Sequence, residues 1–283
     1  MTDDSATTEA SKNGDKPSKK AEPETHPGPP KSFVREYFES GVVTIIMALF
    51  GMTFIVQAVK VPTGSMQNTI TIGDHLLVNK FIFAPGASLP FLPQREIKRG
   101  DIIVFKYPGN REDAAGDRRP DNIPFKTNYV KRVIGLPLEH IVVRGDRVLV
   151  NGQELSEYRF HALDHKDDPT TRDRDEHNKP LDIFPDQAPR KGEPYSVFYS
   201  ENLELDDPTN EFIVPADSYF VMGDNRNNSQ DSRVWGFVKR DLVVGRAMFV
   251  YWSYDESAPP SGSSILGDFF KNTRWNRTGT LIK

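Results

Sequence analysis

Cysteine is missing from the whole chain of 283 residues, and its absence excludes three kinds of chemistry. The protein can form no disulfide, use no thiol nucleophile and build no cysteine-ligated zinc site. The six histidines are scattered and none belongs to an HExxH pattern, so that zinc peptidase motif is also lacking. We therefore expect neither a metal nor a cofactor. The lack of cysteine does not locate the protein, because extracytoplasmic proteins can fold without disulfides.

Positive and negative charges are also nearly balanced. The chain has 36 basic and 40 acidic residues, and 37% of it is hydrophobic, as in an ordinary soluble domain. This balance gives no reason to expect a nucleic-acid partner. Large apolar side chains are nearly absent from residues 1–30, which cannot bury enough surface to offset the entropy lost on ordering. We expect a disordered cytoplasmic tail over residues 1–40.

Long apolar runs are rare, and the one exception is GVVTIIMALFGMTFIVQAV at residues 41–59. As a helix this uncharged run would rise about 28 Å, and the hydrocarbon core of a bilayer is about 30 Å thick. A cleaved signal peptide would have a shorter apolar region at the very N-terminus, and a buried core helix is the other alternative. We expect an uncleaved transmembrane anchor.

The basic residues around this run predict its orientation. More of them precede the run than follow it, and an excess of basic residues marks the cytoplasmic side. The N-terminus is therefore expected in the cytoplasm, and the domain after the anchor outside it. No second run of comparable length follows, which predicts a single-pass protein. The basic residues before the run are Lys19, Lys20, Lys31 and Arg35, and those after it are Lys60 and Lys80.

The remainder of the chain is predicted to be mostly β. Short runs rich in Val, Ile, Phe and Tyr are bounded by Gly, Pro and Asp, and the intervals lack the helical patterns of a parallel α/β sheet. RGDRVLVNG at 144–152 contains two hairpin turn pairs, Gly-Asp and Asn-Gly. We expect an antiparallel β-sheet core over residues 60–156 and 211–254. The charged, proline-rich stretch 157–210 predicts an inserted smaller subdomain or extended loop, and residues 255–283 a C-terminal tail.

The segment VPTGSMQNTI at 61–70 places a serine soon after the apolar run. Pro62 and Gly64 explain a turn here by themselves, so the turn alone is no sign of catalysis. A serine hydroxyl is a weak nucleophile at neutral pH, and Ser65 would need a base within hydrogen-bond reach.

Two residues are candidates for that base. His75 is the nearest histidine, but its neighbour Asp74 would point to the opposite side of a strand and could not orient it. Lys131, in NYVKRVIGLP, would share a strand face with Tyr129 and Val133. Apolar neighbours remove hydration and lower the pKa of a lysine, which can then take a proton as the neutral amine. The alternative is a lysine that reaches solvent, and composition does not choose between the two.

A polar loop, GDNRNNSQDSRVWGFV at 223–238, carries more paired charges than a simple turn needs. It is the last of five ordered segments, after PTGSM, GDHLLVNKF, KRGDIIVF and NYVKRVIGLP. Through these five segments, and their position after an N-terminal anchor, the chain resembles the type I signal peptidase family. The resemblance covers roughly residues 60–254, apart from the long insert.

The resemblance implies a serine peptidase with a Ser-Lys dyad. Ser65 matches the nucleophile and Lys131 the general base, while Ser229 matches the serine that holds the lysine amine in place. The hydroxyl of Thr63 and the backbone N–H of Ser65 would form the oxyanion hole. The family usually has serine at position 63, and threonine keeps the hydroxyl although its methyl group restricts the rotamer.

Other matched positions would support the site or contact the substrate. Two ion pairs are implied beneath the site, Asp231 with Arg233 and Asp224 with Arg132. The family prefers alanine at the −1 and −3 positions of its substrate because its pockets are shallow. The residues that match the lining of those pockets are Val61, Pro62, Tyr129 and Val130.

The implied function is removal of signal peptides from exported preproteins, through an acyl-enzyme, at the bacterial plasma membrane. The resemblance fits a monomer that works near the secretion translocon. The apolar loop FIFAPGASLPFLP at 81–93 is expected to contact the lipid bilayer, unless it folds onto its own core. Two alternatives to the function stay open. One is a Ser-Lys peptidase of another kind, such as a soluble self-cleaving repressor, and the other is an inactive, membrane-tethered binding module.

Overall fold

The computed structural model describes residues 32–84, 94–110, 123–163, 182–183, 194–200, 209–256, 258 and 265–283. The predicted tail up to residue 31, and most of the stretch 164–208, lie outside the described residues. The chain divides into two units, Met1–Met47 and Ala48–Lys283, and each is described by itself.

The N-terminal helix α1 covers Phe33–Phe50 and continues as a π-helical turn, η1, over Gly51–Ile55. Within Phe33–Ile55 an 18-residue window has a mean hydropathy of 1.8, and among the described residues this is the one helix long and apolar enough to cross a membrane. It begins before the predicted anchor, where Arg35 and Glu39 form an i,i+4 ion pair of 2.8 Å. It also ends earlier, because residues 56–59 of the predicted anchor belong to the first strand.

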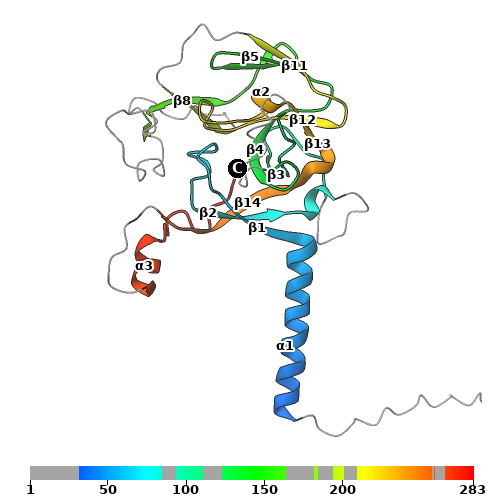
Figure 1. The fold of residues 1–283 in the computed structure, drawn as a ribbon, viewed down its shortest axis with the longest axis vertical. Coiled ribbons are helices and arrows are strands. Elements are labelled where there is room, and N and C mark those ends of the chain that lie inside the picture. Colours follow the sequence, from blue (N-terminus) through cyan, green and yellow to red (C-terminus); the bar gives the residue numbers. More distant parts are fainter. Residues whose placement is uncertain are drawn as a thin grey trace, which may run out of the picture. The chain divides into compact units, whose positions relative to one another are not determined.

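A seven-stranded sheet forms the main body, in the order β1-β2-β14-β3-β4-β12-β13 (Figure 1). Each neighbouring pair is antiparallel, which confirms the predicted fold class. Irregular registers along β14 bend and twist the sheet, as bulges do. The strands are β1 Val56–Lys60, β2 Asp74–Asn79, β3 Ile102–Lys106, β4 Asn128–Gly135, β12 Ser218–Met222, β13 Val238–Lys239 and β14 Val243–Ser253.

A second, four-stranded sheet has the order β11-β5-β6-β7. Its two predicted hairpin turns are confirmed, and both residues of the Asn151-Gly152 turn have positive φ, as a two-residue type I′ turn requires. This sheet shares an apolar core with β4 and β12. Its strands are β5 His140–Arg144, β6 Arg147–Val150, β7 Gln153–Glu154 and β11 Asn210–Ile213.

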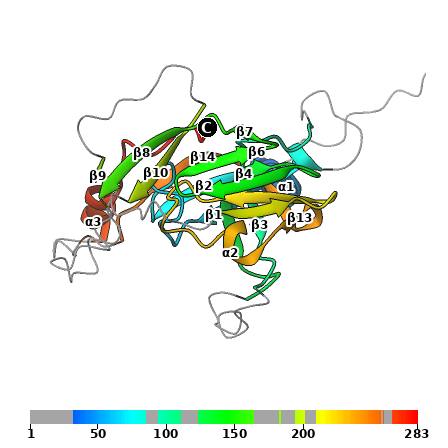
Figure 2. The ribbon, with the colours of Figure 1, turned by 90° about the horizontal axis from the view of Figure 1, so that it is seen from above.

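The described part of the predicted insert forms a third, small sheet in the order β10-β8-β9. Its strands are β8 Tyr158–Leu163, β9 Asp182–Ile183 and β10 Ser196–Ser200. β8 and β10 run parallel and side by side (Figure 2). This sheet is not isolated from the main body, because Phe198 of β10 pairs with Asn225 of the polar loop.

The short helices are η2 Phe81–Phe83, α2 Ser232–Trp235, η6 Arg240–Leu242 and α3 Ile265–Asn272. Phe83 is only 4% exposed and packs in a core with Ile97 and Ile103. The first residues of the loop predicted to meet lipid therefore fold onto the protein, because this cluster takes up their apolar surface. Residues 85–93 of that loop lie outside the described residues.

The C-terminal segment is packed rather than a free tail. The N–H of Ile282 donates to the carbonyl of Met248, and that of Gly279 to the carbonyl of Val250. Ile282 is 6% exposed and joins a buried cluster that also contains Val61 and Met66. The sequence predicted only a tail over residues 255–283, because a short apolar pattern does not show what it packs against.

Candidate active site

The turn that carries Ser65 is fixed by buried apolar side chains on both sides. Val61 and Met66 are 4% and 1% exposed and belong to one core cluster with Leu76. The N–H of Gln67 closes the turn by donating to the carbonyl of Gly64 at 3.0 Å. A Cβ on Gly64 would lie 2.3 Å from Oε1 of Gln67, so glycine suits this position for a steric reason. These contacts hold the two ends of the turn that presents Ser65.

Strand β4 brings Lys131 to this serine. The amine Nζ lies 2.6 Å from Ser65 Oγ, and Lys131 is 4% exposed. The same amine lies 5.4 Å from the ring centre of Tyr129, two residues away on the same strand. The alternative of a lysine that reaches solvent is excluded by this burial. Strand alternation sends the next side chain, Arg132, to the other face of β4.

Burial sets the protonation of Lys131. Removal of the ammonium group from water lowers its pKa from 10.5 to about 8. The carboxylate of Asp231 acts in the opposite direction, Arg233 lowers the pKa further, and Asp224 raises it, but desolvation is the largest effect. With a pKa of about 8, roughly a tenth of the amine is neutral at pH 7 and about half at pH 8, and the neutral amine is the form that a general base needs.

His75 is placed elsewhere. Its ring stacks on Trp252 at 4.7 Å between ring centres, on the outer part of β2, and the described residues show no contact between it and Ser65. Asp74 is buried and already accepts hydrogen bonds from Ser253, at 2.7 Å, and from Arg277. The structure thus brings Lys131, and not the histidine, to the serine.

Asp231 organises the polar loop beside the lysine. It forms an ion pair with Arg233 at 2.8 Å and accepts from the N–H of Gly223 at 3.0 Å. Burial alone would raise the pKa of Asp231, but Arg233 and the hydrogen bonds bring it below its usual value. Ser229 donates its hydroxyl to Asp231 at 2.7 Å, and the described residues show no hydrogen bond between Ser229 and Lys131. The contact implied by the resemblance is therefore replaced by one to the carboxylate.

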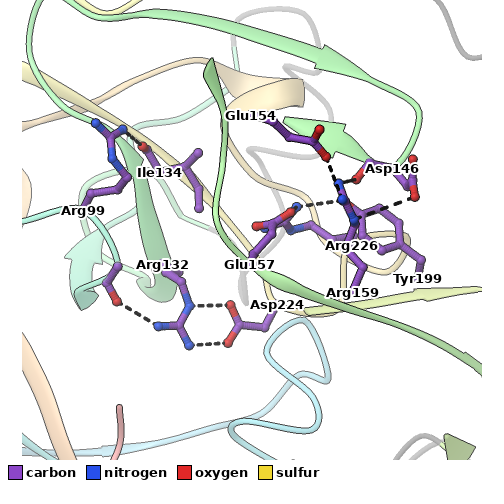
Figure 3. Close-up of polar contacts among 12 residues, drawn as sticks. Arg99, Arg132, Ile134, Asp146, Glu154, Glu157, Arg159, Tyr199, Asp224 and Arg226 are labelled. Carbon is purple, nitrogen blue, oxygen red and sulfur yellow. Dashed lines mark hydrogen bonds and ion pairs between the residues drawn. The ribbon is translucent and has the colours of Figure 1, made fainter. Parts of the chain in front are cut away.

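The second implied ion pair is present below the loop. Arg132 donates twice to Asp224, at 2.8 and 2.7 Å, and both side chains are 1% exposed (Figure 3). Asp224 also accepts from the hydroxyl of Thr69 at 2.6 Å. Burial would lower the pKa of Arg132, but the paired carboxylate raises it above its ordinary value. The pair connects β4, the polar loop and the chain after the nucleophile turn.

A cleft of about 660 Å³ opens over Ser65 and Lys131. It collects Thr63, Ser229 and all four residues that match the family's substrate pockets, Val61, Pro62, Tyr129 and Val130. The rest of its lining was not predicted. Each of these residues lies in or next to one of the quoted segments, and that position is the signal that the sequence offered. These residues are Val59, Lys60, Met66, Thr127, Asn128, Asn227, Asn228 and Gln230.

The chemistry that this arrangement supports is nucleophilic. A buried hydroxyl and an amine of lowered pKa lie within hydrogen-bond distance in an open cleft, which is how serine nucleophiles are activated. Within the described ranges no group of three or more His, Asp or Glu side chains is placed to hold a metal ion.

Comparisons with known proteins agree with these observations. The family model described as signal peptidase, peptidase S26, matches residues 34–252. A signal peptidase I of Pseudomonas fluorescens is 31% identical over 238 residues, which cover 78% of this chain and 73% of that protein. A signal peptidase I of Leptolyngbya laminosa is 34% identical over 221 residues, covering 77% and 81%.

A solved structure is also similar in sequence. The match is to the crystal structure of a signal peptidase I from Enterococcus faecalis V583. The two sequences are 27% identical, and the match covers 54% of this chain and 97% of the chain in that structure. Its TM-score is 0.29, so the description of the fold rests on the strands and their pairing alone.

Proposed function

Because the chain belongs to the signal peptidase family, peptidase S26, we propose that it is a membrane-bound serine endopeptidase that removes signal peptides from exported preproteins. The observation that carries the proposal is the distance of 2.6 Å between Lys131 Nζ and Ser65 Oγ in a cleft open to a peptide. Neither a soluble self-cleaving repressor nor an inactive binding module accounts for the apolar helix and this contact together.

The proposed reaction passes through an acyl-enzyme. Ser65 attacks the scissile carbonyl while neutral Lys131 takes its proton, and the lysine then gives that proton to the leaving amine. That amine is the new N-terminus of the mature protein, and water, deprotonated by the same lysine, then releases the signal peptide from Ser65. The N–H of Ser65 and the hydroxyl of Thr63 hold the negative charge that develops on the carbonyl oxygen. Ser229, through Asp231, keeps the loop beside the lysine in place.

The proposed specificity is for small side chains at the −1 and −3 positions, as in Ala-x-Ala. Support comes from the cleft, where Val61, Pro62, Tyr129 and Val130 lie beside the serine. Val61 is buried and packed in the core, so it cannot move aside to make room for a large substrate side chain.

The proposed setting is the bacterial plasma membrane, with α1 and η1 as the anchor and the N-terminus in the cytoplasm. Phe33–Ile55 has the length and hydropathy for one crossing, and Ser65 follows it closely in the sequence. A signal peptide is itself held in the bilayer, so its cleavage site and a serine so near an anchor would lie at the same surface. Contact of residues 85–93 with lipid, action as a monomer and proximity to the translocon belong to the same proposal.

The test uses the full chain in phospholipid vesicles. A preprotein with an Ala-x-Ala site is incubated with the parent and with the Ser65→Ala variant, and the product is sequenced from its N-terminus. Cleavage after the second alanine by the parent alone supports the proposal, and no cleavage by a folded parent overturns it. In spheroplasts, added protease should digest the region after Lys60. Protection of that region would overturn the orientation.

A further inference from the structure

Asn225 contacts the nucleophile turn through two separate hydrogen bonds. Its side-chain nitrogen Nδ2 donates to the carbonyl oxygen of Gly64 at 3.3 Å, and its backbone N–H donates to the carbonyl oxygen of Ser65 at 3.1 Å. The residue is 3% exposed. It lies in the polar loop, but it carries no charge and was not singled out in the sequence.

The first of these bonds acts on the peptide group that joins Gly64 to Ser65. A peptide group is planar, and its C=O and N–H point in opposite directions. A donor fixed against the Gly64 oxygen therefore also fixes the direction of the Ser65 N–H on the other side of the plane. That N–H is the backbone donor of the proposed oxyanion hole. We propose that Asn225 is a positioning residue, which orients this donor from behind.

A restraint from outside the turn is needed at this point. The Gly64 oxygen also accepts from the N–H of Gln67, but this bond lies within the same turn and moves with it. Glycine has more backbone freedom than any other residue, so the peptide group beside Gly64 is the one most free to rotate. Asn225 connects that peptide group to the loop that also holds Asp231 and Ser229, which lie beside the lysine.

Asn225 is itself held from the opposite side by the small sheet of the insert. The N–H of Phe198 in β10 donates to the carbonyl of Asp224 at 2.8 Å, and the N–H of Arg226 donates to the carbonyl of Phe198 at 2.9 Å. The Arg226 guanidinium is buried against the carboxylate of Glu157 and donates to the hydroxyl of Tyr199 at 2.7 Å (Figure 3). The amide is thus presented to the turn from a buried layer and not from a mobile surface loop.

The test compares substitutions of Asn225 in the full chain in vesicles. Asn225→Ala removes the donor, and Asn225→Asp keeps the shape but offers only acceptors to the Gly64 oxygen. We expect kcat to fall by about 10- to 100-fold, since misplacement by about 1 Å costs up to 10²-fold, with KM within about threefold of the parent. The pH midpoint should stay unchanged, because the lysine is not touched. Asn225→Ser, which shortens the side chain but keeps it polar, serves if either variant folds poorly.

A second measurement separates positioning from general damage. A peptide aldehyde ending in alanine forms a tetrahedral adduct with the serine, and its inhibition constant should rise in proportion to the loss of kcat/KM. The control is Asn151→Ala, which removes the side-chain acceptor for the N–H of His140 at the start of β5 and places alanine at a residue with φ of 51°. It should lower stability while leaving kcat within about twofold of the parent, an expectation that rests on its place in a hairpin turn.

The proposal rests on the proposed function, and its failure is distinguishable from failure of that function. If the parent cleaves the preprotein and Ser65→Ala does not, the function stands, and a kcat near the parental value for Asn225→Ala and Asn225→Asp overturns the positioning role. A rise in KM alone, an unchanged inhibition constant for the aldehyde, or an equal loss of kcat in Asn151→Ala also overturns it.

Discussion

The amine of Lys131 lies 2.6 Å from the hydroxyl of Ser65, and the two residues are 4% and 8% exposed. In water a lysine would be charged at neutral pH and unable to accept a proton. The burial that removes its hydration makes it a base, so the same packing that positions the pair also sets its chemistry.

The pH dependence of cleavage should follow this lysine. Protonated Lys131 cannot take the serine proton, so kcat/KM should fall with decreasing pH below a midpoint of about 8 and level off above it. The measurement is kcat/KM between pH 6 and 10, with chemistry shown to be rate-limiting by single-turnover rates. An activity that stays flat across this range would exclude a neutral lysine as the base.

Replacement of Lys131 by methionine should abolish cleavage and stabilise the fold. In the unfolded chain the lysine has a pKa near 10.5, and in the folded protein about 8, so the folded state disfavours the ammonium form. This lowers the free energy of unfolding by about 3 kcal/mol below pH 8. The effect disappears above pH 10.5, where the lysine is neutral in both states. The methionine variant also loses the hydrogen bond to Ser65, which offsets part of this effect. We therefore expect Lys131→Met to raise the free energy of unfolding by about 2 kcal/mol at pH 7.

Denaturant unfolding of the parent and Lys131→Met at pH 7 and at pH 10.5 measures this effect. The difference should shrink towards zero or change sign at the higher pH, because the unfolded lysine then also loses its proton. Equal stabilities at pH 7, or a methionine variant that is the less stable of the two at that pH, would show that burial of the amine is not costly.

Thr63→Val tests the second proposed oxyanion donor. The substitution keeps the shape and removes only the hydroxyl, and loss of one such donor costs about 10²–10³ in turnover, or roughly 3–4 kcal/mol. KM should change little, since the contact strengthens only as charge develops. Thr63→Ser should stay within about tenfold of the parent. The measurement is kcat and KM for the parent, Thr63→Val and Thr63→Ser. Near-parental turnover by the valine variant would exclude the Thr63 hydroxyl as an oxyanion donor and leave the Ser65 N–H.

The buried pair Arg226–Glu157 should be costly to break. Glu157→Gln leaves a buried guanidinium without its counter-charge, and removal of one partner of such a pair typically costs about 3–5 kcal/mol. The double variant Glu157→Leu/Arg226→Leu should lose less stability than Glu157→Leu and Arg226→Leu lose together as single variants. Urea unfolding of these three variants and the parent gives the coupling energy of the pair. Strict additivity would mean that the two side chains do not stabilise each other.

The sequence predicted well what depends on local pattern or on the ordered segments. Strand alternation placed Lys131 and Arg132 on opposite faces of β4, and Asn151-Gly152 predicted its own turn. It did not predict contacts between distant segments. Arg226 and Glu157 are 69 residues apart, and no periodicity connects them. Ser229 donates to Asp231, two residues away, and this choice of partner is set by the folded geometry of the loop, which no sequence spacing encodes.

The end of the helix was also missed for a physical reason. Val56–Val59 is as apolar as the residues before it, and hydropathy alone continues the helix. The structure ends it at Ile55 because the next five residues pair with β2, from Val56 opposite Asn79 to Lys60 opposite His75. An apolar segment can form either a helix or a strand. Pairing with β2, which is a tertiary interaction, selects the strand here.

The packing of the C-terminal segment has a consequence for the order of events during biosynthesis. Val61 and Met66, which flank the serine turn, share one buried cluster with Ile282. A chain made from its N-terminal end exposes the serine turn long before the residue that completes its packing exists. The buried cluster beside the turn is complete only once Ile282 has been made. We therefore expect cleavage activity to begin only after this C-terminal segment has been synthesised.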